Sequence, residues 1–185
     1  MSLLTATDLC QLPDVPCELR RGVLHMMTPA SGGHGTVSSR LLVALGSHVY
    51  GHGLGALFTA EAGFLLERDP DTVLCPDVAF VAAARLPGGG LAESGFVELA
   101  PDLAVEVYSP SDRPAEVRAK VDDYLRLGVR AVWVLMPAVR AVRVHARQGG
   151  RVTETLLTED DTLEGGDVLP GFSCPIATLF ADLRR

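Results

Sequence analysis

Apolar and charged positions follow one another in blocks between Pro101 and Pro137, and this stretch organises the chain. The block PDLAVEVYSP is typical of a short apolar strand, SDRPAEVRAKVDDYLRLGV of a charged amphipathic helix, and RAVWVLMP of a second apolar strand. Two strands joined by one helix of this length predict a right-handed crossover between parallel neighbours. The pattern therefore predicts an α/β or α+β fold.

The flanking segments predict shorter elements. Before the central stretch we expect a helix at Leu3–Leu12, a hairpin at Glu18–Met27 that turns near Gly22, a long helix at Ser31–Val49, and strands at Ala56–Thr59, Gly63–Leu66 and Pro76–Val81. After it we expect a hairpin from Ala141–Ala146 and Arg151–Leu157 and a short closing helix at Ile176–Leu183. The glycine-rich stretch Arg85–Gly95 predicts a flexible loop. No repeat, low-complexity tract or linker interrupts the pattern, so we predict a single domain over residues 1–185.

The composition narrows the class of protein. The chain has 185 residues, of which 48% are hydrophobic, which is enough for one sizeable core. No apolar run is long enough to cross a membrane and no signal peptide is visible, so we expect a cytoplasmic protein without a membrane partner. The four cysteines have no metal-ligand spacing, which indicates reduced thiols. A net charge of −7 opposes nonspecific binding to nucleic acid but leaves room for a local site.

The first strand of the central stretch carries an acid that folding does not require. Alternation along Leu103–Tyr108 points Leu103, Val105 and Val107 to one face and places Glu106 on the other. Parallel strands are usually covered on both faces, and a buried carboxylate is costly unless it is paired, hydrogen-bonded or bound to a metal. We therefore expect Glu106 to have a specific partner. The expected core residues around it are Val105, Val107, Val132, Val134, Leu135, Leu41 and Val121.

Lys120 is the candidate partner because it is the only lysine among sixteen basic residues. A chain that uses arginine wherever charge alone is needed suggests that this position requires a compact ammonium. Helical geometry puts Lys120 at the edge of the apolar stripe of its helix, beside Tyr124. The alternative is an exposed pair with Glu116, which would stabilise the helix by roughly 0.2–0.5 kcal/mol and have no functional role.

Asp77 is a second candidate acid, placed where the strand Pro76–Val81 begins. If this strand is a neighbour of the strand that carries Glu106, the two carboxylates converge. Two carboxylates, a backbone carbonyl that we assign to Val107, and water form an oxygen-ligand site for Mg²⁺ or Mn²⁺. Such a metal can polarise a phosphoryl oxygen and activate water. A nearby lysine can orient that water or stabilise developing negative charge.

The motifs PDVAFV, PDLAVEVYSPSD and AEVRAKVDDYLRLGVRAVWVLMP resemble the Uma-two family of restriction-endonuclease-like proteins, within the PD-(D/E)xK nuclease superfamily. The resemblance extends to CELRRGVLHMMTPASGGHG and FTAEAGFLLERDPDTVLCPD and so covers nearly the whole chain. It implies a restriction-endonuclease-like core with a mixed central sheet flanked by helices and additional β-hairpins. It also implies a divalent metal and nuclease-type chemistry.

The resemblance assigns roles residue by residue. Asp77 matches the family's PD aspartate, Glu106 its central glutamate, and Lys120 a lysine moved onto the following helix. Glu18 matches a glutamate that completes the acidic cluster, and His34 matches a histidine at a helix entrance, where it either contacts substrate or caps the helix. In the superfamily pattern the lysine lies two residues after the glutamate, where this chain has Tyr108.

The leading hypothesis is a Mg²⁺-dependent endonuclease that hydrolyses phosphodiester bonds of DNA, with a homodimer expected by resemblance. The alternatives are a non-catalytic module that binds nucleic acid or protein while retaining the nuclease fold, and a structural protein that associates through a sheet edge or hairpin. Acidic net charge and the absence of an identifiable basic patch favour the first of these alternatives, the non-catalytic module. The set of two acids and one lysine favours the enzyme.

Two further signals are weaker. His48 and His52 have the i, i+4 spacing that can bind zinc, but the sequence supplies no third ligand and we expect them to be exposed. Glu61 is an acid in a strand–loop region that can lie near the site.

Overall fold

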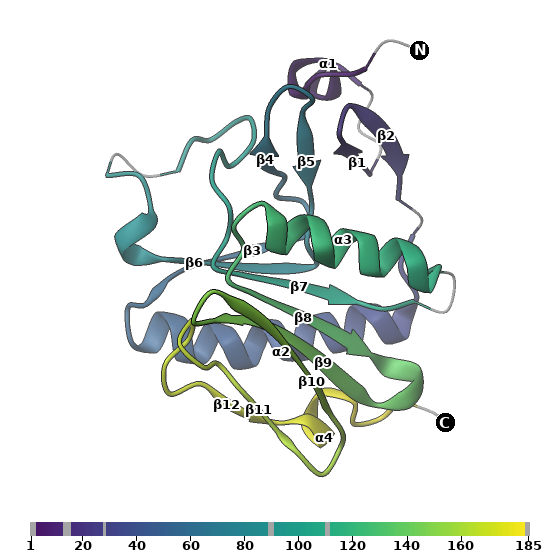
Figure 1. Cartoon of the computed structure of the whole chain (residues 1–185). Helices are drawn as coiled ribbons and strands as arrows, with labels where there is room; N and C mark the ends of the chain where they lie inside the picture. The colour runs from purple at the N-terminus through teal and green to yellow at the C-terminus, as the bar shows by residue number, and fades with distance from the viewer. Residues whose placement is uncertain (1–2, 13–15, 28, 89–90, 110–111, 184–185) are drawn as a thin grey trace.

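The larger of two main sheets in the computed structural model carries the predicted central motif (Figure 1). The structure describes residues 3–12, 16–27, 29–88, 91–109 and 112–183. The larger sheet has six strands in the order β10 (Arg151–Leu157), β9 (Ala141–Gln148), β8 (Ala131–Met136), β7 (Leu103–Val107), β6 (Val78–Ala82) and β3 (Gly55–Thr59). Strands β7 and β8 are parallel and the other pairs are antiparallel, so the sheet is mixed as expected.

The smaller sheet is built from hairpins. Its order is β2 (Val23–Met26), β1 (Cys17–Arg20), β5 (Thr72–Leu74) and β4 (Phe64–Glu67), and every pair is antiparallel. The predicted hairpin turns at Arg21 and Gly22, both at positive φ, where glycine is the residue without steric cost. A two-stranded sheet of β11 (Thr162–Glu164) and β12 (Ser173–Pro175) lies toward the C-terminus.

Helices cover both faces of the larger sheet (Figure 1). Helix α2 (Gly32–Gly51) packs on one face and α3 (Pro114–Arg126) on the other. Two shorter helices, α1 (Ala6–Cys10) and α4 (Ile176–Leu179), lie near the smaller sheet and β12 respectively. Single 3₁₀ turns follow β6 at Ala83–Arg85 and β8 at Pro137–Val139. None of the helices in the described residues is both long and apolar enough to cross a lipid bilayer.

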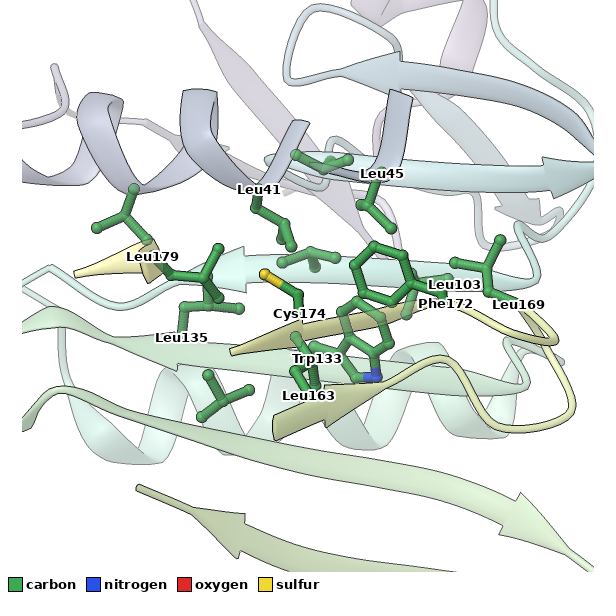
Figure 2. Close-up of a cluster of buried hydrophobic side chains, with 14 of the residues drawn as sticks. Leu41, Leu45, Leu103, Trp133, Leu135, Leu163, Leu169, Phe172, Cys174 and Leu179 are labelled. Atoms are coloured by element: carbon green, nitrogen blue, oxygen red, sulfur yellow. The ribbon is translucent and has the colours of Figure 1, made fainter. Parts of the chain in front are cut away.

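The alternation predicted for β7 sorts its side chains into two cores. Leu103, Val105 and Val107 pack in the cluster that includes α2, while Ala104 packs in the cluster of α3. Figure 2 shows the α2 side, where Trp133 stacks on Phe172 with ring centroids 5.8 Å apart. All the expected core residues are buried, and they divide between the two sides of the sheet: Leu41, Val105, Val107 and Leu135 on the α2 side, Val121, Val132 and Val134 on the α3 side.

Several element boundaries differ from the prediction. The N-terminal helix is shorter because Thr5 caps it, with its hydroxyl accepting from the Asp8 N–H. The strand expected from Pro76 begins at Val78, and the closing helix stops at Leu179. Strands β5, β11 and β12 were not predicted; each has three residues, too few for a period of two to be recognised. Part of the predicted loop Arg85–Gly95, residues 89–90, lies outside the described residues.

Candidate active site

Asp77 and Glu106 lie opposite each other at the end of the β6–β7 pair. The antiparallel register places Val78 opposite Val105, so one step further brings Asp77 opposite Glu106. The Oδ2 atom of Asp77 accepts a hydrogen bond from the backbone N–H of Val107 at 2.7 Å. The condition set by the sequence, that the two strands be neighbours, is therefore met.

Lys120 reaches the same place from α3. Its Nζ lies 2.8 Å from Oε1 and 2.9 Å from Oε2 of Glu106, and 2.8 Å from Oε1 of Glu18. Its side chain is only 14% exposed. Glu116 pairs with Arg113 at 3.5 Å, and no pair between Glu116 and Lys120 occurs in the described residues. The exposed helix pair considered as the alternative is therefore wrong, because the ammonium points into the protein.

Glu18 enters the cluster from the smaller sheet. It belongs to β1 and is buried, with 5% of its surface exposed. Besides Lys120, its Oε1 accepts a hydrogen bond from the backbone N–H of Cys75 at 2.7 Å. One ammonium thus joins an acid from each of the two sheets, Glu18 from the smaller and Glu106 from the larger.

His34 reaches Asp77 from the first turn of α2. Ser31 caps this helix by accepting from the His34 backbone N–H at 3.2 Å, so capping is done by the serine. The His34 ring Nε2 lies 3.1 Å from Asp77 Oδ2. This hydrogen bond raises the pKa of His34, although burial opposes the charged form. The imidazole is thus a partner of the candidate metal-binding acid.

Tyr124 is a site residue that sequence reasoning missed. Its hydroxyl donates to Oε1 of Glu106 at 2.7 Å, while its ring is fully buried in the α3-side cluster. The sequence pattern assigned Tyr124 to the apolar stripe, which is correct for the ring. Its i+4 position relative to Lys120 is the signal that could have revealed the hydroxyl's role.

Burial and charge shift the acid–base behaviour of the cluster. Burial raises the pKa of Glu106 to about 7; the nearby Lys120 lowers it, and Asp77 and Glu18 add to the rise. Burial alone would lower the pKa of Lys120, but the attraction of Glu106 and Glu18 outweighs it and raises that pKa above its ordinary value. The lysine is therefore held as the ammonium, beside a carboxyl group whose pKa is raised by its burial.

The described site residues line one pocket of about 320 Å³. Its walls carry every residue that the sequence singled out for the site: Glu18, His34, Asp77, Glu106, Val107 and Lys120. The pocket is also lined by apolar residues from β2 and the segment after it, among them Met26 and Met27. Carboxylates outnumber cations in the lining, because Asp112 and Glu116 join the acids whereas Arg20 and Lys120 are already paired.

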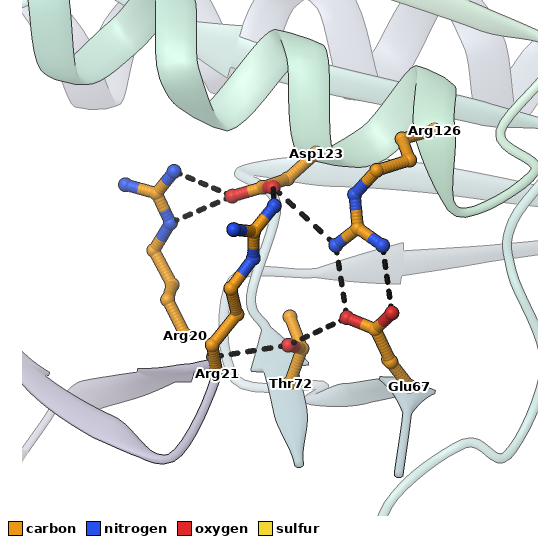
Figure 3. A network of polar contacts seen from close by, with 6 residues as sticks. All are labelled: Arg20, Arg21, Glu67, Thr72, Asp123 and Arg126. Atoms are coloured by element: carbon orange, nitrogen blue, oxygen red, sulfur yellow. Dashed lines mark hydrogen bonds and ion pairs between the residues drawn. The ribbon is translucent and has the colours of Figure 1, made fainter. Parts of the chain in front are cut away.

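A network of ion pairs holds β1 against α3 beside this pocket (Figure 3). Arg20 binds Asp123 through Nε at 3.1 Å and Nη2 at 2.5 Å, and Arg21 approaches the same carboxylate at 3.7 Å. Arg126 forms a bidentate pair with Glu67 of β4 at 2.7 and 2.8 Å. Arg20 lies two residues after Glu18 on β1, and Asp123 lies three residues after Lys120 on α3. The Arg20–Asp123 pair therefore helps to hold Glu18 close to Lys120.

The donor set at the pocket suits a hard divalent cation. Mg²⁺ prefers oxygen ligands and needs only one or two carboxylates besides water, which Asp77 and Glu106 supply. The N–H of Val107 points toward Asp77, and in an extended strand the carbonyl of the same residue points to the same side. Within the described residues no group of three or more His, Cys, Asp or Glu side chains has the arrangement of a metal site. Lys120, Tyr124 and His34 contact these acids directly.

The weaker candidates lie elsewhere. His48 contacts the Pro170 carbonyl at 3.0 Å and His52 contacts the His48 carbonyl at 2.8 Å, and no third ligand joins them in the part of the chain that the structure describes. Glu61 accepts from the Thr59 hydroxyl and lines a different cavity. Neither the histidine pair nor Glu61 belongs to the pocket of Asp77.

A helix-flanked mixed sheet with one acid just before a strand, a second acid in the neighbouring strand and a lysine on the next helix defines a restriction-endonuclease-like nuclease fold. A crystal structure described as a "putative nuclease" from Anabaena variabilis ATCC 29413 has the same fold, with a TM-score of 0.82 and 20% sequence identity over 96% of this chain and 97% of that chain. The chain belongs to the Uma2 family, described as "Putative restriction endonuclease", whose model matches residues 6–177. The comparison with curated proteins gives no match.

Proposed function

We propose that this protein is a nuclease that hydrolyses phosphodiester bonds of DNA with Mg²⁺ or Mn²⁺. The observation that carries the proposal is the convergence of Asp77, Glu106 and Lys120 on one pocket, with Lys120 held between two carboxylates. Asp77, Glu106 and the Val107 carbonyl would hold the metal. Membership of a family described as restriction endonucleases supports the same reaction class.

The chain's own residues supply the ligands for the metal and a fixed positive charge beside the attacking water. A bound divalent ion supplies a Lewis acid for the phosphoryl oxygen and lowers the pKa of water. Lys120, fixed as an ammonium, places a compact positive charge where the attacking water and the phosphoryl oxygens would lie. Glu106, as a ligand of that ion, would hold the metal next to the attacking water.

The remaining pocket residues position these groups. Glu18 shares the Lys120 ammonium and so fixes the direction of the lysine side chain. His34 and the Val107 N–H both bind the same oxygen of Asp77, which directs the other oxygen of this carboxylate to a different partner. The pocket's excess of carboxylates means that a phosphate needs the charge of the metal to enter.

Single-turnover cleavage of supercoiled and single-stranded DNA with Mg²⁺ or Mn²⁺ tests the proposal. Lys120→Ala should slow cleavage by about 10²–10³-fold, the size of effect seen when one transition-state donor is removed. Lys120→Arg should also be slow, because a planar guanidinium does not replace a compact ammonium at the same distance. The matched control is Arg118→Ala, which removes an exposed positive charge from the same helix and should leave the rate unchanged.

Parent-like rates in Lys120→Ala would overturn the catalytic role of the lysine. Absence of cleavage by the parent with either metal would instead favour the second candidate, a binding module that keeps the nuclease fold. The observations that favour this module are the net charge of −7 and the excess of carboxylates in the pocket lining. Binding of the same DNA, followed by fluorescence anisotropy, separates a binding module from an inactive preparation. The single domain, the homodimer and the cytoplasmic location stay predictions.

A further inference from the structure

The register of the smaller sheet, extended by two residues, brings Cys17 and Cys75 opposite each other beside Glu18. The antiparallel register of β1 and β5 places Leu19 opposite Val73. Two steps along each strand, in opposite directions, bring Cys17 opposite Cys75, which directly follows β5. Residues directly opposite in an antiparallel pair point to the same face, so the two thiols share a face of the sheet.

Packing and access support this placement. Cys17 packs against the cluster that contains Leu19 and Val73, on the face opposite to Glu18. Cys17 and Cys75 also line one cavity of about 730 Å³, which is separate from the pocket of Asp77. Both thiols are only partly buried, so a small reagent can reach them through this cavity.

The backbone around the pair leaves room for a cross-link. Opposite residues of antiparallel strands have Cα atoms about 4.5–5.5 Å apart, which is inside the range of about 4.4–6.8 Å that a disulfide spans. The Cys75 N–H donates to the Glu18 side chain and is therefore not committed to a ladder bond with Cys17. Closing the bond requires only that both side chains rotate toward each other about χ1.

We propose that Cys17 and Cys75 form a dithiol site that an oxidant of the disulfide class converts into a cross-strand disulfide. The thiolate of one cysteine attacks the oxidant R–S–S–R, forms a mixed disulfide and releases RS⁻. The second thiolate attacks the protein sulfur of that mixed disulfide, forms the Cys17–Cys75 bond and releases the other RS⁻. The protein loses two electrons and two protons in total, and the oxidant becomes two RSH molecules.

The charge around the pair favours the cross-linked product over the free thiolates. Burial raises the pKa of the Cys17 and Cys75 thiols, and the nearby Glu18 carboxylate adds to the rise by repelling a thiolate. A disulfide carries no charge, so the same carboxylate does not oppose it. The reaction should therefore be slow but, once complete, stable to weak reductants.

The bond would join β1 to β5 at the place where both strands enter the candidate active site. Glu18 follows Cys17 directly, and Asp77 lies two residues beyond Cys75. The link closes a loop that runs from Cys17 to Cys75. Cross-linking a long loop gives the largest gain in stability, because it restricts the unfolded chain most. The site itself does not depend on the proposed nuclease function.

The test treats the 185-residue protein with oxidised glutathione and maps the cross-linked peptides by mass spectrometry after thiol blocking. The parent and the control Cys10→Ser should each lose two hydrogens and give a Cys17–Cys75 peptide. Their melting temperature should rise on the order of 10 °C without reductant and return to the starting value with it. Cys17→Ser and Cys75→Ser should show neither the internal link nor the rise.

Cys10→Ser is included because Cys10 is exposed and lines the same cavity. A link from Cys10 to either partner, or separate mixed disulfides on Cys17 and Cys75 with no internal bond, would overturn the proposal. Loss of the link in Cys10→Ser would do the same. Because the readouts are mass and melting temperature, an inactive nuclease would not affect the result.

Discussion

At the scale of single residues, Lys120 is the contact on which the site depends. A fully charged ammonium in a poorly solvated place is unfavourable unless anions surround it, and Glu18 and Glu106 do so at 2.8 Å each. Replacing either acid would leave a buried charge with half its compensation. The three residues therefore act as a unit, and effects of their substitutions should not be additive.

His34 contributes to the pH dependence of the stability of the metal-free protein. Its folded pKa is raised by the hydrogen bond to Asp77, so the stability it contributes is fully present below its unfolded pKa of about 6.5 and is lost as pH rises through the folded pKa. With EDTA present, the parent should exceed His34→Gln in free energy of unfolding at mildly acidic pH, and the difference should shrink as pH rises. Urea denaturation at several pH values measures it. A difference that stays constant or grows with pH would contradict this assignment.

The sequence could predict which residues form the site better than it could predict the distances between them. Asp77, Glu106 and Lys120 stand out in the sequence because of an acid in an apolar strand and a lysine kept as the only one. Their mutual distances required the pairing of β6 with β7, which no local pattern encodes. The hydroxyl contact of Tyr124 was missed for a related reason: helical periodicity records that a ring is apolar and says nothing of its polar end.

At the scale of elements, β8 is the central support of the larger sheet. It lies between β7 and β9, and its side chains alternate between the α2 and α3 sides. The predicted strand–helix–strand was recognisable because its elements are long enough for their periodicity to show. The three-residue strands β5, β11 and β12 form through tertiary pairing, and their sequences alone do not identify them.

Val134→Ala should test the place of β8 in the α3-side core. Val134 is buried, so the substitution should lower the free energy of unfolding by about 1–3 kcal/mol through lost burial and a cavity. Val152→Ala is the matched control, because Val152 lies on the edge strand β10 and is 46% exposed. Chemical denaturation of both variants gives the comparison. An unchanged midpoint for Val134→Ala would show that β8 does not carry the core.

At the scale of the whole molecule, the protein is acidic, and part of this negative charge lies at the candidate active site. The chain carries a net charge of −7, and several of its acids line the candidate active site. Like charges in a compact site are unfavourable unless countered, and Lys120 counters only part of them. A divalent cation would relieve the remainder, so metal binding and global stability should be coupled.

Mn²⁺ should therefore raise the melting temperature of the parent. At a metal concentration of about 100 times Kd the gain is about 2.7 kcal/mol, which for a chain of this size is a rise of about 5–10 °C. Asp77→Asn and Glu106→Gln should show little or no rise, and EDTA should reverse the effect in the parent. Differential scanning fluorimetry suffices for the measurement. Equal rises in all three proteins would place the metal at another site.

The joining of the two sheets at Lys120 has a consequence for how the protein matures. Glu18 arrives with the smaller sheet and Glu106 with the larger, so the complete set of pocket groups exists only after both have docked on α3. A chain caught partway through folding, with one sheet formed, holds an incomplete set. Under the proposed nuclease function, full cleavage activity should therefore appear only once the smaller sheet has brought Glu18 to Lys120.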